Sequence, residues 1–140
     1  MNTEKGISLL IMIVDDNPVD LFVGKRTMEI SGYAKNVLLQ SSAVEALEYL
    51  KENADRPKRL PDIIFLDLNM PLLNGFQFLQ QFQDLSQTVT SNCKVVILSS
   101  SSAPRDINML KNNPAIIKML TKPLDQHKLW ELQQESLKYA

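Results

Sequence analysis

Residues 9–16 of the chain read LLIMIVDD, six apolar side chains followed directly by Asp15 and Asp16. Residues 63–67 repeat the arrangement in shorter form as IIFLD, which ends in Asp67. Apolar runs that are continuous rather than alternating are typical of strands buried on both faces, as in a parallel sheet. We therefore expect a buried strand at each segment, with carboxylates where the apolar run ends.

Helical patterns separate five apolar runs along the chain. The expected strands are Leu9–Val14, Val37–Leu39, Ile63–Leu66, Val95–Leu98 and Ile116–Leu120. Since strands and helices alternate, the sequence predicts a single-domain α/β protein in which helices cover both faces of a parallel sheet. The polar stretch Lys51–Pro61 is expected to form a surface loop.

Capping signals mark the starts of the first two expected helices. Asn17 followed by Pro18 is typical of an N-cap and a first-turn proline, and Gly32 predicts the end of that helix. Ser42 and Glu45 have the spacing of a capping box, in which each side chain bonds the other residue's backbone N–H. A second helix is therefore expected directly after Ser42.

Apolar spacing indicates three further helices. One begins near Gly75, a short one includes Ile107 and Leu110, and Asp125 caps the last. In this last helix we expect Trp130 to pack in the core rather than to contact a partner. The other positions expected to face inward are Leu129, Leu132 and Leu137.

The composition excludes several classes of protein. Hydrophobic residues make up 44% of the 140 residues and charged residues 22%, which excludes a disordered or low-complexity chain. The net charge of −1 gives no basic face for general nucleic-acid binding, so no direct nucleic-acid partner is expected. The single cysteine, Cys93, excludes an internal disulfide and a Cys-based zinc site. We expect no membrane insertion and a cytoplasmic protein, because no run could span a bilayer and no signal-peptide pattern is present.

Polar side chains stand where four of the apolar runs end. Asp15 and Asp16 end the first run and Asp67 the third, while Ser99 follows the fourth and Lys122 lies just past the fifth. Open parallel sheets bind ligands outside the carboxyl ends of their strands, where the strand order reverses. If the order is 2-1-3-4-5, the first and third strands are neighbours, and the three carboxylates converge with the hydroxyl and the lysine close by.

Three carboxylates in one cleft repel one another and need a cation. Carboxylate oxygens suit a hard ion, and Mg²⁺ favours one or two carboxylates together with water and phosphate oxygens. An aspartate carboxylate can attack phosphorus to give an aspartyl phosphate, while a metal and a lysine stabilise charge on the phosphoryl oxygens. These residue types together therefore point to phosphoryl chemistry.

At these residues the sequence resembles the receiver domain of two-component response regulators, of the chemotaxis (CheY-like) type. The matching pieces are Val14-Asp15-Asp16, Asp67-Leu68-Asn69-Met70-Pro71 with Gly75, Leu98-Ser99-Ser100 and Thr121-Lys122-Pro123. The resemblance implies a flavodoxin-like fold with a five-stranded parallel sheet of order 2-1-3-4-5. It also implies a short N-terminal extension at residues 1–7, a receiver domain at residues 8–140 and no output domain.

The resemblance implies a metal site and a phosphoacceptor at this edge of the sheet. It implies that Asp67 accepts the phosphoryl group and contributes to Mg²⁺ binding. Asp16 would bind the metal directly, and Asp15 would assist, through water. The backbone carbonyl of Asn69 would be a further ligand.

The resemblance also implies a switch. Ser99 would be the hydroxyl that moves toward the phosphoryl group, and Lys122 would pair with the phosphoryl oxygens. The peptide bond between Lys122 and Pro123 is typically cis in this family. The sequence departs from the family at Met119, where an aromatic ring is usual, so a switch based on the rotation of a ring cannot operate.

These inferences predict a stand-alone response regulator. A sensor histidine kinase or phosphotransfer protein would transfer a phosphoryl group to Asp67 in a Mg²⁺-dependent reaction, and phosphorylation would switch the binding of a downstream protein whose identity is unknown. A second copy of the chain is kept as a further candidate partner, in a homodimer. Such a protein is a signalling switch with slow loss of its own phosphate, not an enzyme with turnover.

Three alternatives belong to other classes. A Mg²⁺-dependent phosphatase with an aspartate nucleophile would use an Asp-x-Asp motif whose second carboxylate is the acid and base, but Asn69 stands at that position. A pseudo-receiver would bind partners without phosphorylation. The chain keeps every side chain that phosphoryl chemistry needs, which argues against this alternative. A nucleotide-binding α/β domain would need glycine-rich motifs that the chain lacks.

Overall fold

The computed structural model describes residues 9–100, 110 and 112–138. It forms one five-stranded sheet in the order β2-β1-β3-β4-β5, with all neighbouring strands parallel. The strands are β1 Leu10–Val14, β2 Asn36–Gln40, β3 Ile63–Asp67, β4 Lys94–Ser99 and β5 Ile116–Thr121. The predicted fold class and strand order are confirmed. The N-terminal extension expected at residues 1–7 lies outside the described residues, as does the short helix expected around Ile107, of which only Leu110 is described.

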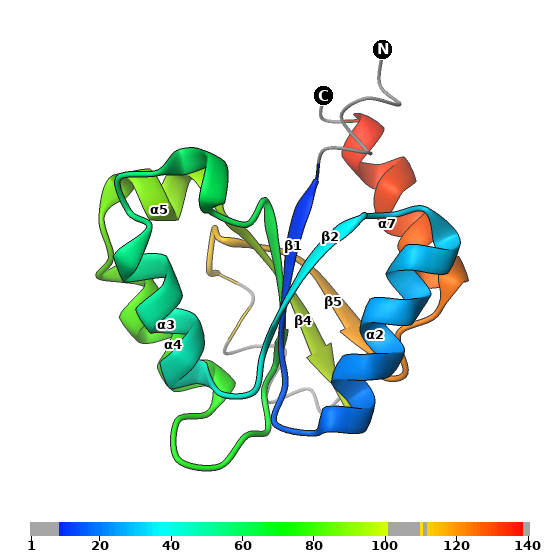
Figure 1. Ribbon diagram of the computed structural model, residues 1–140, viewed down its shortest axis with the longest axis horizontal. Coiled ribbons are helices and arrows are strands. Elements are labelled where there is room, and N and C mark those ends of the chain that lie inside the picture. Colours follow the sequence, from blue (N-terminus) through cyan, green and yellow to red (C-terminus); the bar gives the residue numbers. More distant parts are fainter. Residues whose placement is uncertain (1–8, 101–109, 111, 139–140) are drawn as a thin grey trace.

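Helices cover both faces of this sheet (Figure 1). The helices α2 and α7 lie on one face, and α3, α4 and α5 lie on the other. Their bounds are α2 Pro18–Ser31, α3 Ala43–Glu52, α4 Gly75–Gln83, α5 Gln87–Asn92 and α7 Gln126–Lys138. Among the described residues, no helix combines the length and the apolar character that crossing a membrane requires.

The central strands are buried on both faces, as their continuous apolar runs predict. In β1, Ile11 and Ile13 pack into the cluster beneath α2 and α7, whereas Met12 and Val14 pack into the cluster beneath α3 and α4. Each large apolar side chain that is fully buried stabilises the fold by about 1.5–3 kcal/mol. The edge strands β2 and β5 are more exposed, so β1, β3 and β4 form the buried centre of the sheet.

The start of α2 confirms the predicted cap. The Asn17 side chain accepts hydrogen bonds from the N–H groups of Val19, at 2.9 Å, and of Asp20, at 3.3 Å. The helix ends at Gly32, whose φ of 73° is left-handed and therefore favours glycine. These contacts fix the first turn of α2 directly after β1, at the carboxyl edge of the sheet.

The predicted capping box of α3 forms only in half. Ser42 accepts the N–H of Glu45 at 3.1 Å, as expected. The carboxylate of Glu45, however, accepts the hydroxyl of Ser41 at 3.3 Å and does not reach back to the Ser42 backbone. The full box forms instead at the start of α4, between Asn74 and Gln77.

The connections contain helical turns that the sequence pattern did not indicate. The expected loop Lys51–Pro61 is shorter than predicted, because α3 continues to Glu52 and a 3₁₀ turn, η1, spans Pro57–Arg59. The short helix α5 reads QTVTSN, a sequence poor in strong helix formers. Its Val89 is fully buried, so tertiary packing rather than helix propensity fixes this helix.

The prediction for Trp130 is wrong. Its side chain is 57% exposed, whereas Leu129 and Leu132 are buried as expected. The position next to Leu129 on the helix is turned away from the sheet by about 100°, which leaves the indole on the outer side. The side chain of Leu137 lies outside the described side chains.

The loop that follows β3 packs closely against the start of α4. The N–H of Gly75 donates to the carbonyl of Leu68 at 3.0 Å. A Cβ atom at Gly75 would lie 2.7 Å from the Leu68 Cα and 2.9 Å from the Asp67 carbonyl oxygen. Because those are backbone atoms, the position accepts glycine alone without movement of the chain.

We expect Gly75→Ala to lower the free energy of unfolding by about 1–3 kcal/mol, the usual effect of overpacking. Urea denaturation measures this change. Gly24→Ala is the matched control, because its new Cβ meets only the terminal methyl of Ile13, at 3.0 Å, and alanine favours the helix. Equal stability of Gly75→Ala and the wild type would contradict the close approach.

Candidate functional site

The site lies at the carboxyl edge of the sheet, where the strand register brings the polar side chains together. Asp15 follows β1, and its N–H donates to the carbonyl of Gln40 at the end of β2, at 3.1 Å. Asp67 is the last residue of β3, and Ser99 is the last residue of β4. The N–H of Lys122 donates to the Ser99 carbonyl at 2.8 Å, so β5 delivers this lysine to the same edge.

Three aspartates form a cluster at this edge. Each of Asp15, Asp16 and Asp67 offers an oxygen, and these oxygens lie within 4.8 Å of one another. Asp15 and Asp67 are buried, at 2% and 4% exposure, while Asp16 is exposed. The convergence follows from the neighbouring positions of β1 and β3. A set of three carboxylates at this spacing fits a hard divalent cation such as Mg²⁺.

Asp67 lies in an environment that disfavours its charge. Its carboxylate accepts the N–H of Asn69 at 3.1 Å, and its other oxygen lies 3.4 Å from the ammonium nitrogen of Lys122. Burial raises the pKa of Asp67 above its usual value, and the charge of Asp15 raises it further. The bond from Asn69 and the charge of Lys122 lower this pKa but do not cancel the effect of burial.

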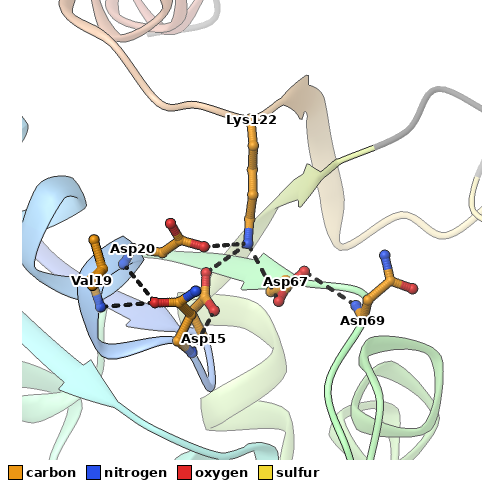
Figure 2. A network of polar contacts seen from close by, with 7 residues as sticks. Asp15, Val19, Asp20, Asp67, Asn69 and Lys122 are labelled. Atoms are coloured by element: carbon orange, nitrogen blue, oxygen red, sulfur yellow. Dashed lines mark hydrogen bonds and ion pairs between the residues drawn. The ribbon is translucent and has the colours of Figure 1, made fainter.

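Lys122 connects three carboxylates (Figure 2). Its Nζ lies 2.8 Å from Asp15 Oδ2, 3.1 Å from Asp20 Oδ2 and 3.4 Å from Asp67 Oδ2. Burial alone would lower the pKa of Lys122, but its hydrogen bonds to Asp15 and Asp20 and the charge of Asp67 outweigh burial and raise it. The lysine is therefore a permanent cation at this edge.

Asp20 is the member of this network that the sequence reasoning missed. It lies in the first turn of α2, where an acidic residue is ordinary because it complements the helix dipole. The signal that could have identified it is geometric, since helical side chains tilt toward the N-terminus, which here faces the strand ends. Sequence spacing alone does not show which strand-end residue such a side chain contacts.

Ser99 and Met119 lie on the β4–β5 side of the site. Ser99 is buried, at 5% exposure, and Met119 is half-buried against the cluster beneath α3 and α4. The arrangement places a hydroxyl-bearing residue beside the strand that carries Lys122. The proposed switch role of Ser99 stays a prediction.

A second lysine supports the segment that carries Lys122. The ammonium group of Lys128, from α7, donates to the carbonyls of Thr121, at 2.5 Å, and Pro123, at 2.7 Å. The peptide bond between Lys122 and Pro123 is cis, as the resemblance implies. The sequence reasoning gave Lys128 no such role, because the contact depends on how α7 packs after the turn.

Comparisons with known proteins agree with the fold. The Response regulator receiver domain family matches residues 11–134. A receiver protein of known structure from Dyadobacter fermentans DSM 18053 is 34% identical, with a TM-score of 0.79, and the match covers 91% of this chain and 96% of the other. A response regulator from Cytophaga hutchinsonii is 26% identical, with a TM-score of 0.82 and the same coverage.

A two-component response regulator of Oryza sativa subsp. japonica is 28% identical over 104 residues, which make up 73% of this chain. The same match makes up 44% of the rice protein, so the chain spans less than half the length of that curated relative.

The raised pKa of Asp67 predicts that Asp67→Asn stabilises the metal-free protein at pH 7. The folded-state pKa of Asp67 lies above its unfolded-state pKa, which is about 3.9. Between these two values the folded state holds a proton that the unfolded state has lost, so the wild type loses stability as the pH rises through this range. Asparagine does not ionise, so Asp67→Asn should become more stable than the wild type as the pH rises through that range. Below that range the variant should show no such gain.

Urea denaturation in EDTA across this pH range measures the difference. Asp84→Asn, which alters an exposed aspartate outside the site, is the control. A variant Asp67→Asn that is less stable than the wild type at pH 7 would refute the assigned electrostatics.

Proposed function

The chain belongs to the response regulator receiver domain family, and on this premise we propose that Asp67 accepts a phosphoryl group in a Mg²⁺-dependent reaction. The observation that carries the proposal is the convergence of three carboxylates and the Lys122 ammonium at one edge of the sheet. Phosphorylation would then switch the binding of a downstream protein.

The carboxylate cluster supports a bound Mg²⁺. Asp15, Asp16 and Asp67 supply hard oxygen ligands, and the backbone carbonyl of Asn69 is a further ligand in this proposal. When bound, the ion supplies positive charge that offsets the repulsion between the carboxylates and the incoming phosphoryl group. The exposure of Asp16 leaves this side of the cluster accessible to solvent and to a phosphodonor.

The reaction itself is a displacement at phosphorus. A carboxylate oxygen of Asp67 attacks the phosphorus of a phosphohistidine or of a small acyl phosphate, and a new O–P bond forms. The bond between phosphorus and the donor breaks at the same time, and the donor leaves with that electron pair. Lys122 pairs with the phosphoryl oxygens as charge develops on them. Later attack by water returns the Asp67 carboxylate and releases inorganic phosphate.

The partner that supplies the phosphoryl group is, in this proposal, a sensor histidine kinase or a phosphotransfer protein. Ser99 would bond a phosphoryl oxygen and carry the change toward β5 and α7. Met119 would repack along with this movement, because its flexible thioether adopts several low-energy rotamers. The amide of Asn69 cannot act as an acid and base, which disfavours a phosphatase.

We expect acetyl phosphate with Mg²⁺ to phosphorylate the protein once, at Asp67. Intact mass and peptide mapping identify the modified residue, and chelation of Mg²⁺ should abolish it. Asp67→Asn should lose the modification, whereas Asp84→Asn, at an exposed position outside the cluster, should keep the wild-type yield. Wild-type yield in Asp67→Asn would refute the assignment.

Mg²⁺ affinity should depend strongly on Asp16. We expect Asp16→Ala to weaken Mg²⁺ binding by about tenfold or more, which corresponds to about 1.4 kcal/mol. Calorimetric titration measures the affinity, and Asp84→Asn is again the matched control. Because Asp16 is exposed, its removal should change the stability of the metal-free protein little, so a loss of folding cannot explain the result. Equal Mg²⁺ affinity in Asp16→Ala and the wild type would contradict the metal site.

A further inference from the structure

The ammonium group of Lys122 is shared unequally among its three carboxylate partners. Its contacts to Asp15 and Asp20, at 2.8 and 3.1 Å, are hydrogen bonds, and the 3.4 Å contact to Asp67 is the longest. A lysine ammonium has three N–H donors and no acceptor. Two of the three donors are therefore directed toward β1 and α2 rather than toward the proposed phosphoacceptor.

Asp20 is held in place by the cap of α2. Its backbone N–H donates to the Asn17 side chain at 3.3 Å, which fixes the first helical turn. From this turn its carboxylate points toward Lys122, on the side of the ammonium group away from Asn69 (Figure 2). Asp20 does not belong to the cluster of three aspartates whose oxygens lie within 4.8 Å. Its contact is with the lysine, not with the proposed metal site.

We propose that Asp20 is a positioning residue that holds Lys122 toward α2 and so restrains its pairing with a phosphoryl group on Asp67. This inference rests on the proposed phosphorylation of Asp67. A phosphoryl group must compete with Asp20 for the ammonium group. This competition favours the unphosphorylated state, so Asp20 limits the occupancy of the phosphorylated state.

The size of the restraint follows from the exposure of the pair. The Asp20 side chain is 41% exposed and that of Lys122 is 21% exposed, so water screens the contact in part. Partly exposed ion pairs of this kind contribute little. Removal of the Asp20 charge should therefore tighten the binding of a phosphoryl mimic by about fivefold, which corresponds to about 1 kcal/mol.

The test is a titration with beryllofluoride at saturating Mg²⁺, followed by ¹⁹F NMR of the bound fluoride. Asp20→Asn should bind about fivefold more tightly than the wild type, and Asp20→Glu, which restores the charge, should return toward the wild-type affinity. Glu29→Gln removes a negative charge from the far end of the same helix and should leave the affinity unchanged. A role in helix structure alone would weaken the fold without tightening the binding.

A second pair of variants shows whether Asp20 acts through the lysine. In a Lys122→Gln background, Asp20→Asn should change the beryllofluoride affinity by less than about twofold, because coupled sites are non-additive and the lysine through which Asp20 acts is absent. An undiminished effect there would overturn the proposal, because Asp20 would then act by charge alone. Equal or weaker binding by Asp20→Asn, with normal binding by the wild type, would overturn this inference only. Absence of both beryllofluoride binding and phosphorylation by acetyl phosphate in the wild type would refute the proposed function itself.

Discussion

Two buried carboxylates, Asp15 and Asp67, end neighbouring strands at one edge of the sheet, and their repulsion is the constraint around which this edge is arranged. Within the described residues, Lys122 is the cation that approaches both of them. It does so because β5 runs parallel to β4 and because Lys128 holds the turn that follows β5. The position of this one ammonium group therefore depends on the strand order, the strand register and the packing of α7 together.

The same edge carries an electrostatic cost that the rest of the molecule offsets. Burial raises the pKa of Asp67, so the ionised form that the proposed phosphoryl transfer needs is the form that destabilises the fold. The central strands, buried on both faces, supply the compensating hydrophobic stabilisation. Functional sites in natural proteins often keep unfavourable interactions that their chemistry requires, while the rest of the fold stabilises the molecule.

The first turn of α2 links ordinary helix capping to this site. Asn17 bonds the backbone N–H groups of the turn, and the turn presents Asp20 to Lys122. A cap that would otherwise serve only helix stability thus also fixes the direction of a charged side chain. Local structure and site electrostatics are coupled here because the helix begins directly after the strand that supplies Asp15 and Asp16.

The sequence by itself determined the five strands, the caps at Asn17 and Asp125 and the candidate residues at the strand ends, because these depend on local periodicity and on residue chemistry. It could not determine α5, the exposure of Trp130 or the half-formed box at Ser42, since packing against distant residues decides each of them. Only the tertiary structure showed that Lys122 is shared with Asp20, 102 positions earlier in the chain. A contact between residues so far apart depends on the three-dimensional path of the chain, to which sequence spacing gives no direct access.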